Sequence, residues 1–307
     1  MATTTSITTT YAGEAAAQFI SPALLSGATI ENGGISVKPN IKYKEVIKKL
    51  STNDIVKDAT CDFDATSTIT LTERILTPEY QQVNLQLCKK DFTSDWQALE
   101  MGLSAHHNLP SSFADYLISY VAAKVAERTE TSIWQGDTSS NGQFDGFSTL
   151  LAADANLPTG NEVTGTTVTS ANAIAEIQKV VDAIPNAVYG KQDLKVFVSN
   201  KIAKAYIAAQ AALGYRDNYH VGQSEMNFQG VPLFVAPGLG DNVMVAAETS
   251  NLYFGTSLLS DHQEVKVLDM SDLDGSDNVR VVMRFTAGVQ YGSVEDIVTY
   301  GIVNSAN

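Results

Sequence analysis

Apolar residues recur every three or four positions between residues 112 and 134, the period of an α-helix that buries one face. The stripe comprises Phe113, Leu117, Val121, Val125 and Ile133, is broken by Thr129, and is flanked by Ala114, Ile118, Ala122 and Ala126. Pro110 and a serine N-cap at 111 or 112 suit a helix start, with Asp115 placed as in a capping box. We predict one helix of about 34 Å from Ser112 to Trp134.

The middle of the chain predicts two more helices with a strand between them. Residues 170–185 place Ile174, Ile177, Val181 and Ile184 on one face, with Ser170 as a cap and Pro185 as the stop. The run "LKVFVS" at 194–199 is typical of a short buried strand. Asn200 is expected to cap a third helix through 201–213, which Gly214 would end. This order indicates an α/β or α+β subdomain.

The segment "IKYKEVIKKLS" at 41–51 is interpreted as a short basic amphipathic helix. Tyr43, Val46, Ile47 and Leu50 have helical spacing. The lysines at 42, 44, 48 and 49 are either a solvated face or a local basic patch for nucleic acid or an acidic partner.

Residues 62–92 are predicted to form a long two-stranded hairpin. Ile69 and Leu71 alternate with threonines on the outgoing arm, and Val83, Leu85 and Leu87 alternate with polar residues on the return. Pro78 and Glu79 lie between the arms. A hairpin of this length is marginal alone, so we expect its own body or a neighbouring molecule to cover it.

The first 40 residues have no regular pattern and are rich in Thr, Ala, Ser and Gly. They are interpreted as an extended arm without a core of its own, either free or packed on a neighbouring subunit. The apolar residues available for such packing are Tyr11, Phe19, Ile20, Leu24 and Leu25.

From Val231 onward the pattern becomes that of short strands: "VPLFVA", "NVMVAAE", "NLYFG", "EVKVLD" and "NVRVVMRF". In the last of these, Val279, Val281, Met283 and Phe285 share one face, opposite Arg280 and Arg284. There is no repeat at a fixed period. The early segments, the long helix and the late strands therefore predict one interwoven α+β body.

Composition and charge narrow the class of protein. The 307 residues are 44% hydrophobic and 18% charged, which is ordinary for a folded chain. The net charge of -14 argues against binding nucleic acid through the overall field, so any contact with DNA must be local. Two cysteines, no basic signal region before Lys38 and no apolar run long enough to span a membrane favour a reduced, intracellular setting.

The polar loop "WQGDTSSNGQFDGF" at 134–147 looks, taken alone, like a phosphate cradle or a cation site. A second candidate, "DMSDLDGSDN", resembles a calcium loop only loosely, because its spacing differs from the twelve-residue pattern. An acidic, solvent-exposed turn between strands is the better interpretation of Asp269, Asp272, Asp274 and Asp277. Gly238-Leu239-Gly240 lacks the third glycine and the helix of a dinucleotide site.

The histidines do not predict a metal site. His106 and His107 are adjacent and cannot easily face one ion, while His220 and His262 stand alone. No hydrolase or nucleotide-binding motif occurs. We therefore assign no catalytic, cofactor-binding or metal residue and no cofactor.

The order of the parts is more informative than any single residue. The runs "ERTETSIWQGDTSSNGQFDGF", "FVSNKIAKAYIAAQAALG", "FQGVPLFVAPGLG" and "VRVVMRFTAGVQYGSVEDIVTYG" resemble segments of the major capsid proteins of tailed bacteriophages, which have the Hong Kong 97-type fold. The resemblance covers nearly the whole chain. It implies that residues 112–134 are the spine helix and that Gly136 lets the chain turn at its end.

The resemblance also implies a division of the chain into parts. These are an N-terminal arm (1–45), a basic helix with an extended hairpin loop (46–95), a peripheral subdomain with the spine helix (96–165), an axial subdomain (166–235), and strands returning to both (236–307).

The implied function is structural: hexamers and pentamers that close into an icosahedral shell around double-stranded DNA, assembled in the bacterial cytoplasm, with no membrane partner. Portal, scaffold or decoration proteins are the further partners expected, and contact with DNA would be weak and local. The alternatives are an encapsulin-like nanocompartment and a metal-dependent enzyme that uses His106, Asp272 and Asp274. Some capsid proteins join a hairpin lysine to a neighbour's asparagine, and Lys89 and Lys90 are the candidates for that chemistry here.

Overall fold

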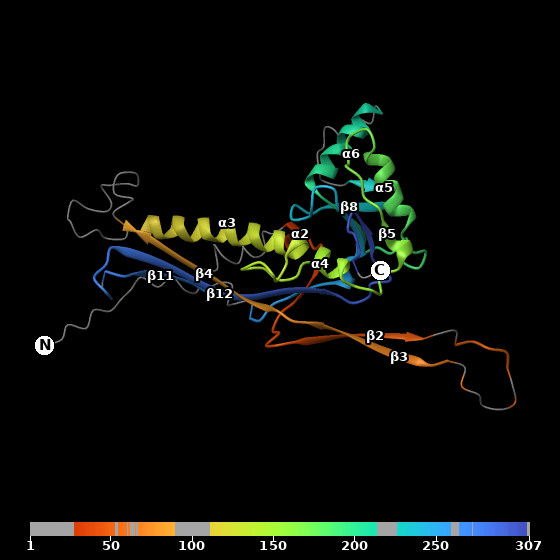
Figure 1. Cartoon of the computed structure of the whole chain (residues 1–307), viewed down its shortest axis with the longest axis horizontal. Coiled ribbons are helices and arrows are strands. Elements are labelled where there is room, and N and C mark those ends of the chain that lie inside the picture. The colour runs from red at the N-terminus through yellow and green to blue at the C-terminus, as the bar shows by residue number, and fades with distance from the viewer. Residues whose placement is uncertain are drawn as a thin grey trace.

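The computed structural model describes residues 28–52, 55–59, 61, 65, 67–89, 111–213, 226–258, 264–271 and 273–305. Most of the predicted N-terminal arm, including its apolar residues, lies outside this part of the chain, as do Lys90, Gly214 and all four histidines. Figure 1 shows an elongated body with a helical lobe at one side and a thin hairpin that projects from its base.

The helices in the described residues are α2 (Ala28–Glu31), α3 (Ser111–Gln135), α4 (Phe147–Ala152), α5 (Ala173–Asp182) and α6 (Asn200–Ala212), with short 3-10 turns at Thr159–Asn161 and Thr249–Asn251. The predicted long helix is confirmed. Of its predicted stripe, Leu117, Val121, Val125 and Ile133 are all buried. The two predicted central helices are also present, although Ser199, not Asn200, caps α6 by accepting from the Ile202 amide at 3.4 Å.

The strands within the described ranges form three sheets. The first sheet has the order β1-β10-β12-β11, and β4 also pairs with the long strand β12. The second has the order β5-β13-β9-β6-β8-β7. The third contains only β2 and β3. Their bounds are β1 (Ser36–Lys38), β2 (Glu45–Thr52), β3 (Ile69–Leu76), β4 (Glu79–Cys88), β5 (Glu162–Val163), β6 (Leu194–Val198), β7 (Asn227–Phe228), β8 (Val231–Val235), β9 (Met244–Glu248), β10 (Leu252–Gly255), β11 (Val265–Asp269), β12 (Asn278–Tyr291) and β13 (Val298–Tyr300).

The spine helix α3 and the first sheet enclose one core. Alternate residues of β12, among them Val279, Val281 and Met283, point into this core together with the apolar stripe of α3, while Arg280 and Arg284 are exposed. The two-residue period predicted for this strand is therefore confirmed.

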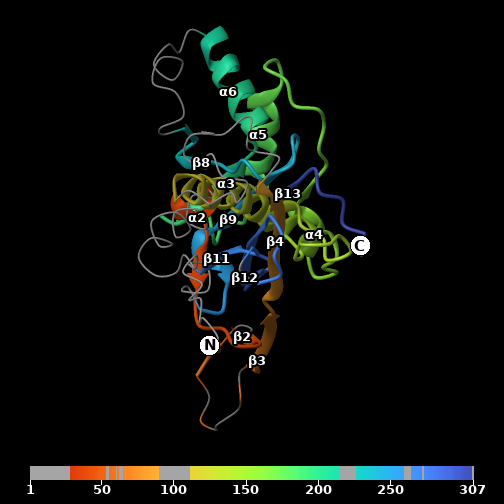
Figure 2. The same cartoon turned by 90° about the vertical axis from the view of Figure 1, so that its left-hand side faces the viewer.

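The second sheet is buried on both faces. Val196 and Val198 of β6 pack in a core with α5 and α6, whereas Phe197, between them, belongs to the core beneath α3. The Phe197 ring lies 5.0 Å from that of Trp134 at the end of α3. This strand therefore links the two cores, and the helical lobe of Figures 1 and 2 stands on it.

The predicted basic helix at 41–51 is wrong, because residues 45–52 form strand β2. Val46, Ile47 and Leu50 match a helical period, but short apolar runs are ambiguous between helix and strand. Val46 and Ile47 are β-branched, and an eight-residue antiparallel ladder with β3 satisfies the backbone of the segment. The lysines are consequently divided between two faces and do not form one basic patch.

The predicted hairpin at 62–92 has its two strands but the wrong partners. β3 pairs with β2, whereas β4 pairs with β12 over ten residues, Asn278–Ala287. The two strands follow one another along a single path, which Figure 1 shows in orange. Only Thr77 and Pro78 separate them. The favoured two-residue hairpin turns require positive φ at the first loop residue or at both. The β-branched Thr77 and the fixed negative φ of Pro78 both oppose this, so the connection does not favour a tight reversal of the chain.

Candidate assembly surfaces

The β2–β3 hairpin has two faces of different character. The strands are antiparallel with Val46 opposite Ile75, Lys48 opposite Glu73, and Leu50 opposite Leu71. Directly opposed residues share a face, so all three pairs point the same way. We call this surface, made by Val46, Lys48, Leu50, Ile69, Leu71, Glu73 and Ile75, the apolar face of the hairpin.

The apolar face lacks cover within the described chain. Leu50, Ile69 and Leu71 are 64%, 66% and 60% exposed, and Val46 and Ile75 are also exposed. A soluble monomer rarely leaves such a contiguous apolar surface in water, and an isolated two-stranded ribbon is marginally stable. The face therefore has the properties of a surface that another molecule covers.

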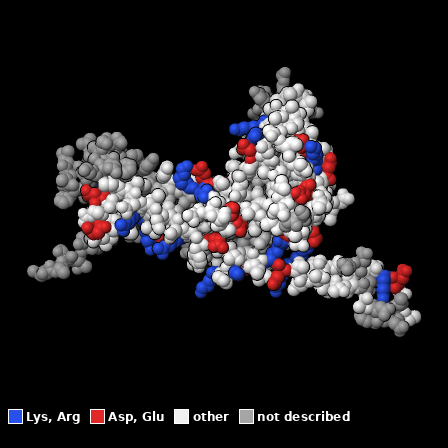
Figure 3. Space-filling model, in the orientation of Figure 1, with Lys and Arg blue, Asp and Glu red and all other residues white. Residues whose placement is uncertain are grey.

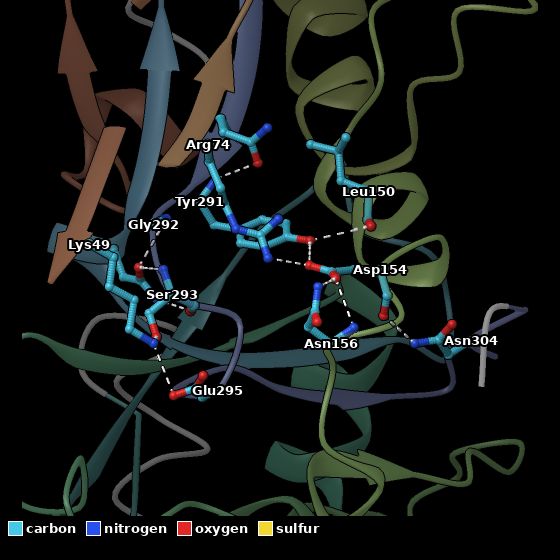
Figure 4. Close-up of polar contacts among 12 residues, drawn as sticks. Lys49, Arg74, Leu150, Asp154, Asn156, Tyr291, Gly292, Ser293, Glu295 and Asn304 are labelled. Atoms are coloured by element: carbon cyan, nitrogen blue, oxygen red, sulfur yellow. Dashed lines mark hydrogen bonds and ion pairs between the residues drawn. The ribbon is translucent and has the colours of Figure 1, made fainter. Parts of the chain in front are cut away.

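The opposite face of the hairpin attaches it to the body. At its root, Ile47 and Leu76 are buried in a small cluster with Ile41 and Tyr253. Farther along β2, the Lys49 ammonium donates to Ser293 Oγ and to Glu295 Oε2, both at 2.9 Å. Figure 4 shows this contact beside the turn after β12.

Arg74 of β3 makes a further attachment to the body (Figure 4). Its guanidinium is paired with the Asp154 carboxylate and lies 4.4 Å from the centre of the Tyr291 ring. The Tyr291 hydroxyl donates to Asp154 Oδ2 at 2.8 Å. The backbone amide of Asn156 donates to the other oxygen, Oδ1, at 2.9 Å. We call Arg74, Asp154 and Tyr291 the hairpin clamp.

The environment of the hairpin clamp keeps Asp154 charged. Burial would raise the pKa of this carboxyl, but the hydrogen bonds from Asn156, Tyr291 and Arg74 outweigh it and hold the pKa below its usual value. Burial and the adjacent carboxylate raise the pKa of Tyr291, so its hydroxyl stays protonated and donates. The Arg74 guanidinium is therefore paired with an ionised Asp154 carboxylate.

The loop at 134–147 is architectural. The amide of Gly146 donates to the carbonyl of Gly136 at 2.9 Å, and the Thr149 hydroxyl donates to the same carbonyl at 2.6 Å. A Cβ at Gly136 would lie 2.1 Å from the Phe144 carbonyl oxygen. Close approach, not a left-handed backbone, explains this glycine, while Gly142 does have φ +71°. Asp145, which would serve a cation site, instead accepts from the Thr138 amide and hydroxyl, both at 2.9 Å.

The start of the described chain is tied to the spine helix. The buried Glu130 carboxylate accepts from the Thr29 amide at 3.1 Å and from its hydroxyl at 2.5 Å. Trp134 Nε1 donates to the same hydroxyl at 2.9 Å. Gly238 packs so closely on the Glu130 carbonyl oxygen that a Cβ would lie 2.1 Å from it, which gives this glycine a packing role.

The acidic turn between β11 and β12 is only partly solvent-exposed. Asp274 accepts from Ser276 at the surface, but Asp269 is 8% exposed and forms an ion pair with the buried Lys89 at 3.0 Å. Asp269 also accepts from the Ser271 amide and hydroxyl. Lys89 is thereby engaged within its own chain, which removes it as a crosslinking candidate. Asp272 and Lys90 lie outside the described residues.

The described residues offer no cluster of three or more His, Cys, Asp or Glu suited to a metal ion, and none of their helices is long and apolar enough to span a membrane. On the face drawn in Figure 3, positive and negative side chains are interspersed and form no single basic field. The sequence predicted a hairpin face that needs cover, from the alternation of Ile69 and Leu71 with threonines, but it paired this strand with the wrong partner. The hairpin clamp was not predicted.

Comparisons with known proteins find similar solved structures, whereas no family model and no curated protein sequence matches. The capsid of the native GTA particle matches with a TM-score of 0.61 and 14% identity, over 98% of this chain and 94% of that one. The satellite phage P4 procapsid matches with a TM-score of 0.58 and 11% identity, over 93% of this chain and 90% of that one. The SrpI encapsulin of Synechococcus elongatus matches with a TM-score of 0.53 and 8% identity, over 94% of this chain and 90% of that one. The chain therefore has the α+β fold of phage capsid proteins, as the sequence resemblance predicted.

Proposed function

We propose that this chain is the major capsid protein of a tailed bacteriophage. Copies of it would form hexamers and pentamers that close into an icosahedral shell around double-stranded DNA, assembled in the bacterial cytoplasm. Its role is structural, not catalytic. Portal, scaffold or decoration proteins would be its further partners, and no cofactor is required.

The observation that carries this proposal is the apolar face of the β2–β3 hairpin. Burying one large aliphatic side chain contributes about 1.5–3 kcal/mol, and the face presents five of them on an arm held away from the body. A contact repeated around every copy in a shell gives a strong lattice even where each contact is weak. The match to capsid folds over nearly the whole chain supports the same reading.

The division of the chain follows from the proposal. We assign the N-terminal arm to 1–45, the peripheral subdomain to 96–165, the axial subdomain to 166–235, and the returning strands to 236–307. The hairpin loop is assigned to 46–95, and the β4 part of this segment lies in the first sheet. Strands β10 to β12 lie in the sheet beneath the spine helix, and β9 and β13 lie in the sheet of the helical lobe, which supports a last segment shared by both subdomains.

The test is assembly, followed by negative-stain electron microscopy and size-exclusion chromatography at several protein and salt concentrations. Wild-type protein should give shells, tubes or capsomer rings. The double variant Leu50→Lys/Leu71→Lys puts two charges on the apolar face and should lose assembly. Ser51→Lys/Thr70→Lys is the matched control, because this exposed pair lies one residue away on the opposite face.

Equal assembly of the two double variants would contradict the role of the apolar face. A wild-type chain that stays a monomer or dimer, alone and with a scaffolding protein, would overturn the capsid proposal. An encapsulin-like compartment is the second candidate, favoured by the match to the SrpI encapsulin. Nuclease-protected DNA inside particles from infected cells would support the phage capsid, and a protein cargo the compartment.

A further inference from the structure

Two Asn-Gly dipeptides occur in the chain, Asn32-Gly33 and Asn141-Gly142. An asparagine before glycine is open to attack by the next backbone nitrogen, because glycine has no Cβ to screen that nitrogen. The two dipeptides are closely matched in structure. Both asparagines are exposed, and both glycines have a left-handed backbone, with φ +65° at Gly33 and +71° at Gly142.

The dipeptides differ in the state of the glycine amide. The Gly33 amide donates to the Ile30 carbonyl at 3.2 Å, at the end of α2. In the part of the chain that the structure describes, neither the Gly142 amide nor the Asn141 side chain makes a hydrogen bond. A Cβ at Gly142 would meet only Gln81 Oε1, at 3.8 Å, so the space around this residue is open. Of the two glycines, Gly142 therefore has the nitrogen that is free to react.

The chemically similar dipeptide Asp145-Gly146, in the same loop, shows how a fold blocks such a reaction. The Gly146 amide donates to the Gly136 carbonyl at 2.9 Å, and the Asp145 carboxylate accepts from the Thr138 amide and hydroxyl, both at 2.9 Å. The attacking nitrogen and the carbon that it would attack are thus both held by other contacts. Asn141-Gly142 has neither restraint.

We propose that Asn141 is a site of spontaneous deamidation and that the hydrogen bond of Gly33 protects Asn32. The Gly142 nitrogen attacks the side-chain carbonyl carbon of Asn141. A C–N bond forms, and the side-chain nitrogen leaves as ammonia with the proton that the Gly142 amide gives up. Water then opens the resulting succinimide at one of its two carbonyls. Opening at the side-chain carbonyl gives aspartate, and opening at the backbone carbonyl gives isoaspartate, whose main chain runs through the former side chain.

Isoaspartate would lengthen the main chain next to Gln143, the residue that joins this loop to its surroundings. The Gln143 carbonyl accepts from Gln81 Nε2 of β4 at 3.4 Å, and its Oε1 accepts from the Asp137 amide at 3.0 Å. The longer main chain displaces Gln143, and the new carboxylate adds charge to a loop that already contains Asp137 and Asp145. The modification therefore loosens residues 137–143 from β4.

Timed incubation of the full chain in mildly alkaline buffer, followed by peptide mass spectrometry, measures both dipeptides in one sample. Asn141 should deamidate at least about threefold faster than Asn32, which is the factor expected when one hydrogen bond must open before Gly33 reacts. The same incubation in urea is the control. Unfolding frees both amides, so the two rates should then agree within about twofold.

Two variants separate the consequences of the reaction. Asn141→Gln moves the side-chain carbonyl out of the favourable ring geometry, so the aged variant should keep native hydrogen exchange at 137–143. Aged wild type, with its isoaspartate content measured by isoaspartyl methyltransferase labelling, should exchange faster there. Freshly prepared Asn141→Asp carries the added charge without the longer main chain, and it should exchange more slowly than the aged wild type.

Three results would overturn the inference. Equal rates at Asn141 and Asn32 in the native protein would remove the role of the Gly33 hydrogen bond. A native rate at Asn141 more than about tenfold below its rate in urea would show that the folded loop blocks the attack. Unchanged exchange in protein that contains isoaspartate would remove the structural consequence. These measurements need no assembly, so each outcome leaves the capsid proposal as it stands.

Discussion

The charge of Asp154 helps to hold the β2–β3 hairpin in place through its ion pair with Arg74. Its side chain is 7% exposed and is paired with Arg74, which comes from a strand eighty residues earlier in the chain. A carboxylate buried in this way contributes to stability only while it is ionised. Its pKa is lowered in the folded protein, so the contribution is complete above the unfolded-state value of about 3.9 and is lost as the pH falls through the folded-state value.

We predict that Asp154→Asn lowers the free energy of unfolding at pH 7 by about 1–3 kcal/mol, because the Arg74 guanidinium loses its charged partner. The difference from wild type should shrink as the pH falls below about 4 toward the lowered folded-state pKa, because the wild-type carboxyl then also becomes neutral. Urea unfolding midpoints at pH 7, 5, 4 and 3 measure this.

Asp182→Asn is the control, since Asp182 is exposed on the last turn of α5. It should change stability at pH 7 by no more than about 0.5 kcal/mol. A pH profile of Asp154→Asn parallel to that of wild type would show that this carboxyl does not contribute through its charge.

At the scale of elements, the end of the spine helix depends on Gly136. Only a residue without a Cβ allows the Phe144 carbonyl to approach this closely and the Gly146 amide to reach the Gly136 carbonyl. Gly136→Ala should therefore displace the loop 137–146 and destabilise the protein by about 2 kcal/mol or more. Differential scanning calorimetry would register a lower Tm.

Gly160→Ala is the matched control, because a Cβ there meets nothing within 4 Å and its φ is not left-handed. Its Tm should stay within about 2 °C of wild type, since a surface substitution changes stability by at most about 0.5 kcal/mol. Equal Tm values for the two variants would show that the loop accommodates a side chain at Gly136.

The elements that the sequence predicted well are those whose own periodicity determines burial. The apolar stripe of α3 and the alternate apolar residues of β12 each pack into one core along their length. The segment 45–52 has no single apolar environment, because Ile47 is buried against the body whereas Leu50 is exposed to solvent. An apolar residue that is exposed in the single chain is indistinguishable by pattern from a core residue.

The hairpin clamp could not be predicted from the sequence for a different reason. Arg74, Asp154 and Tyr291 come from β3, the segment after α4 and the end of β12, and only the strand pairings bring them together. The Thr77–Pro78 connection did carry a usable signal, since proline opposes a tight reversal. This signal becomes decisive only when β12 is known to be the partner that β4 pairs with in place of β3.

At the scale of the whole molecule, the fold and the proposed assembly would use separate surfaces. None of the described residues between 50 and 71 is buried, so the distal hairpin adds nothing to the cores. Replacing residues 50–71 by a short Gly-Ser linker should leave the circular dichroism spectrum and the urea midpoint nearly unchanged, while abolishing shells in electron micrographs. A large loss of stability would show that the hairpin supports its own body, and retained assembly would show that the lattice does not need it.

The continuous path of β3 and β4 determines how the molecule would bear load. A pull on the hairpin tip travels along the backbone through Thr77 and Pro78 into β4, which is held to β12 by a ladder of ten residue pairs. Antiparallel ladder bonds lie perpendicular to the strands, so such a pull loads them together in shear and does not open them one at a time. In the proposed shell, a force that stretches neighbouring copies apart would therefore load this ladder in shear.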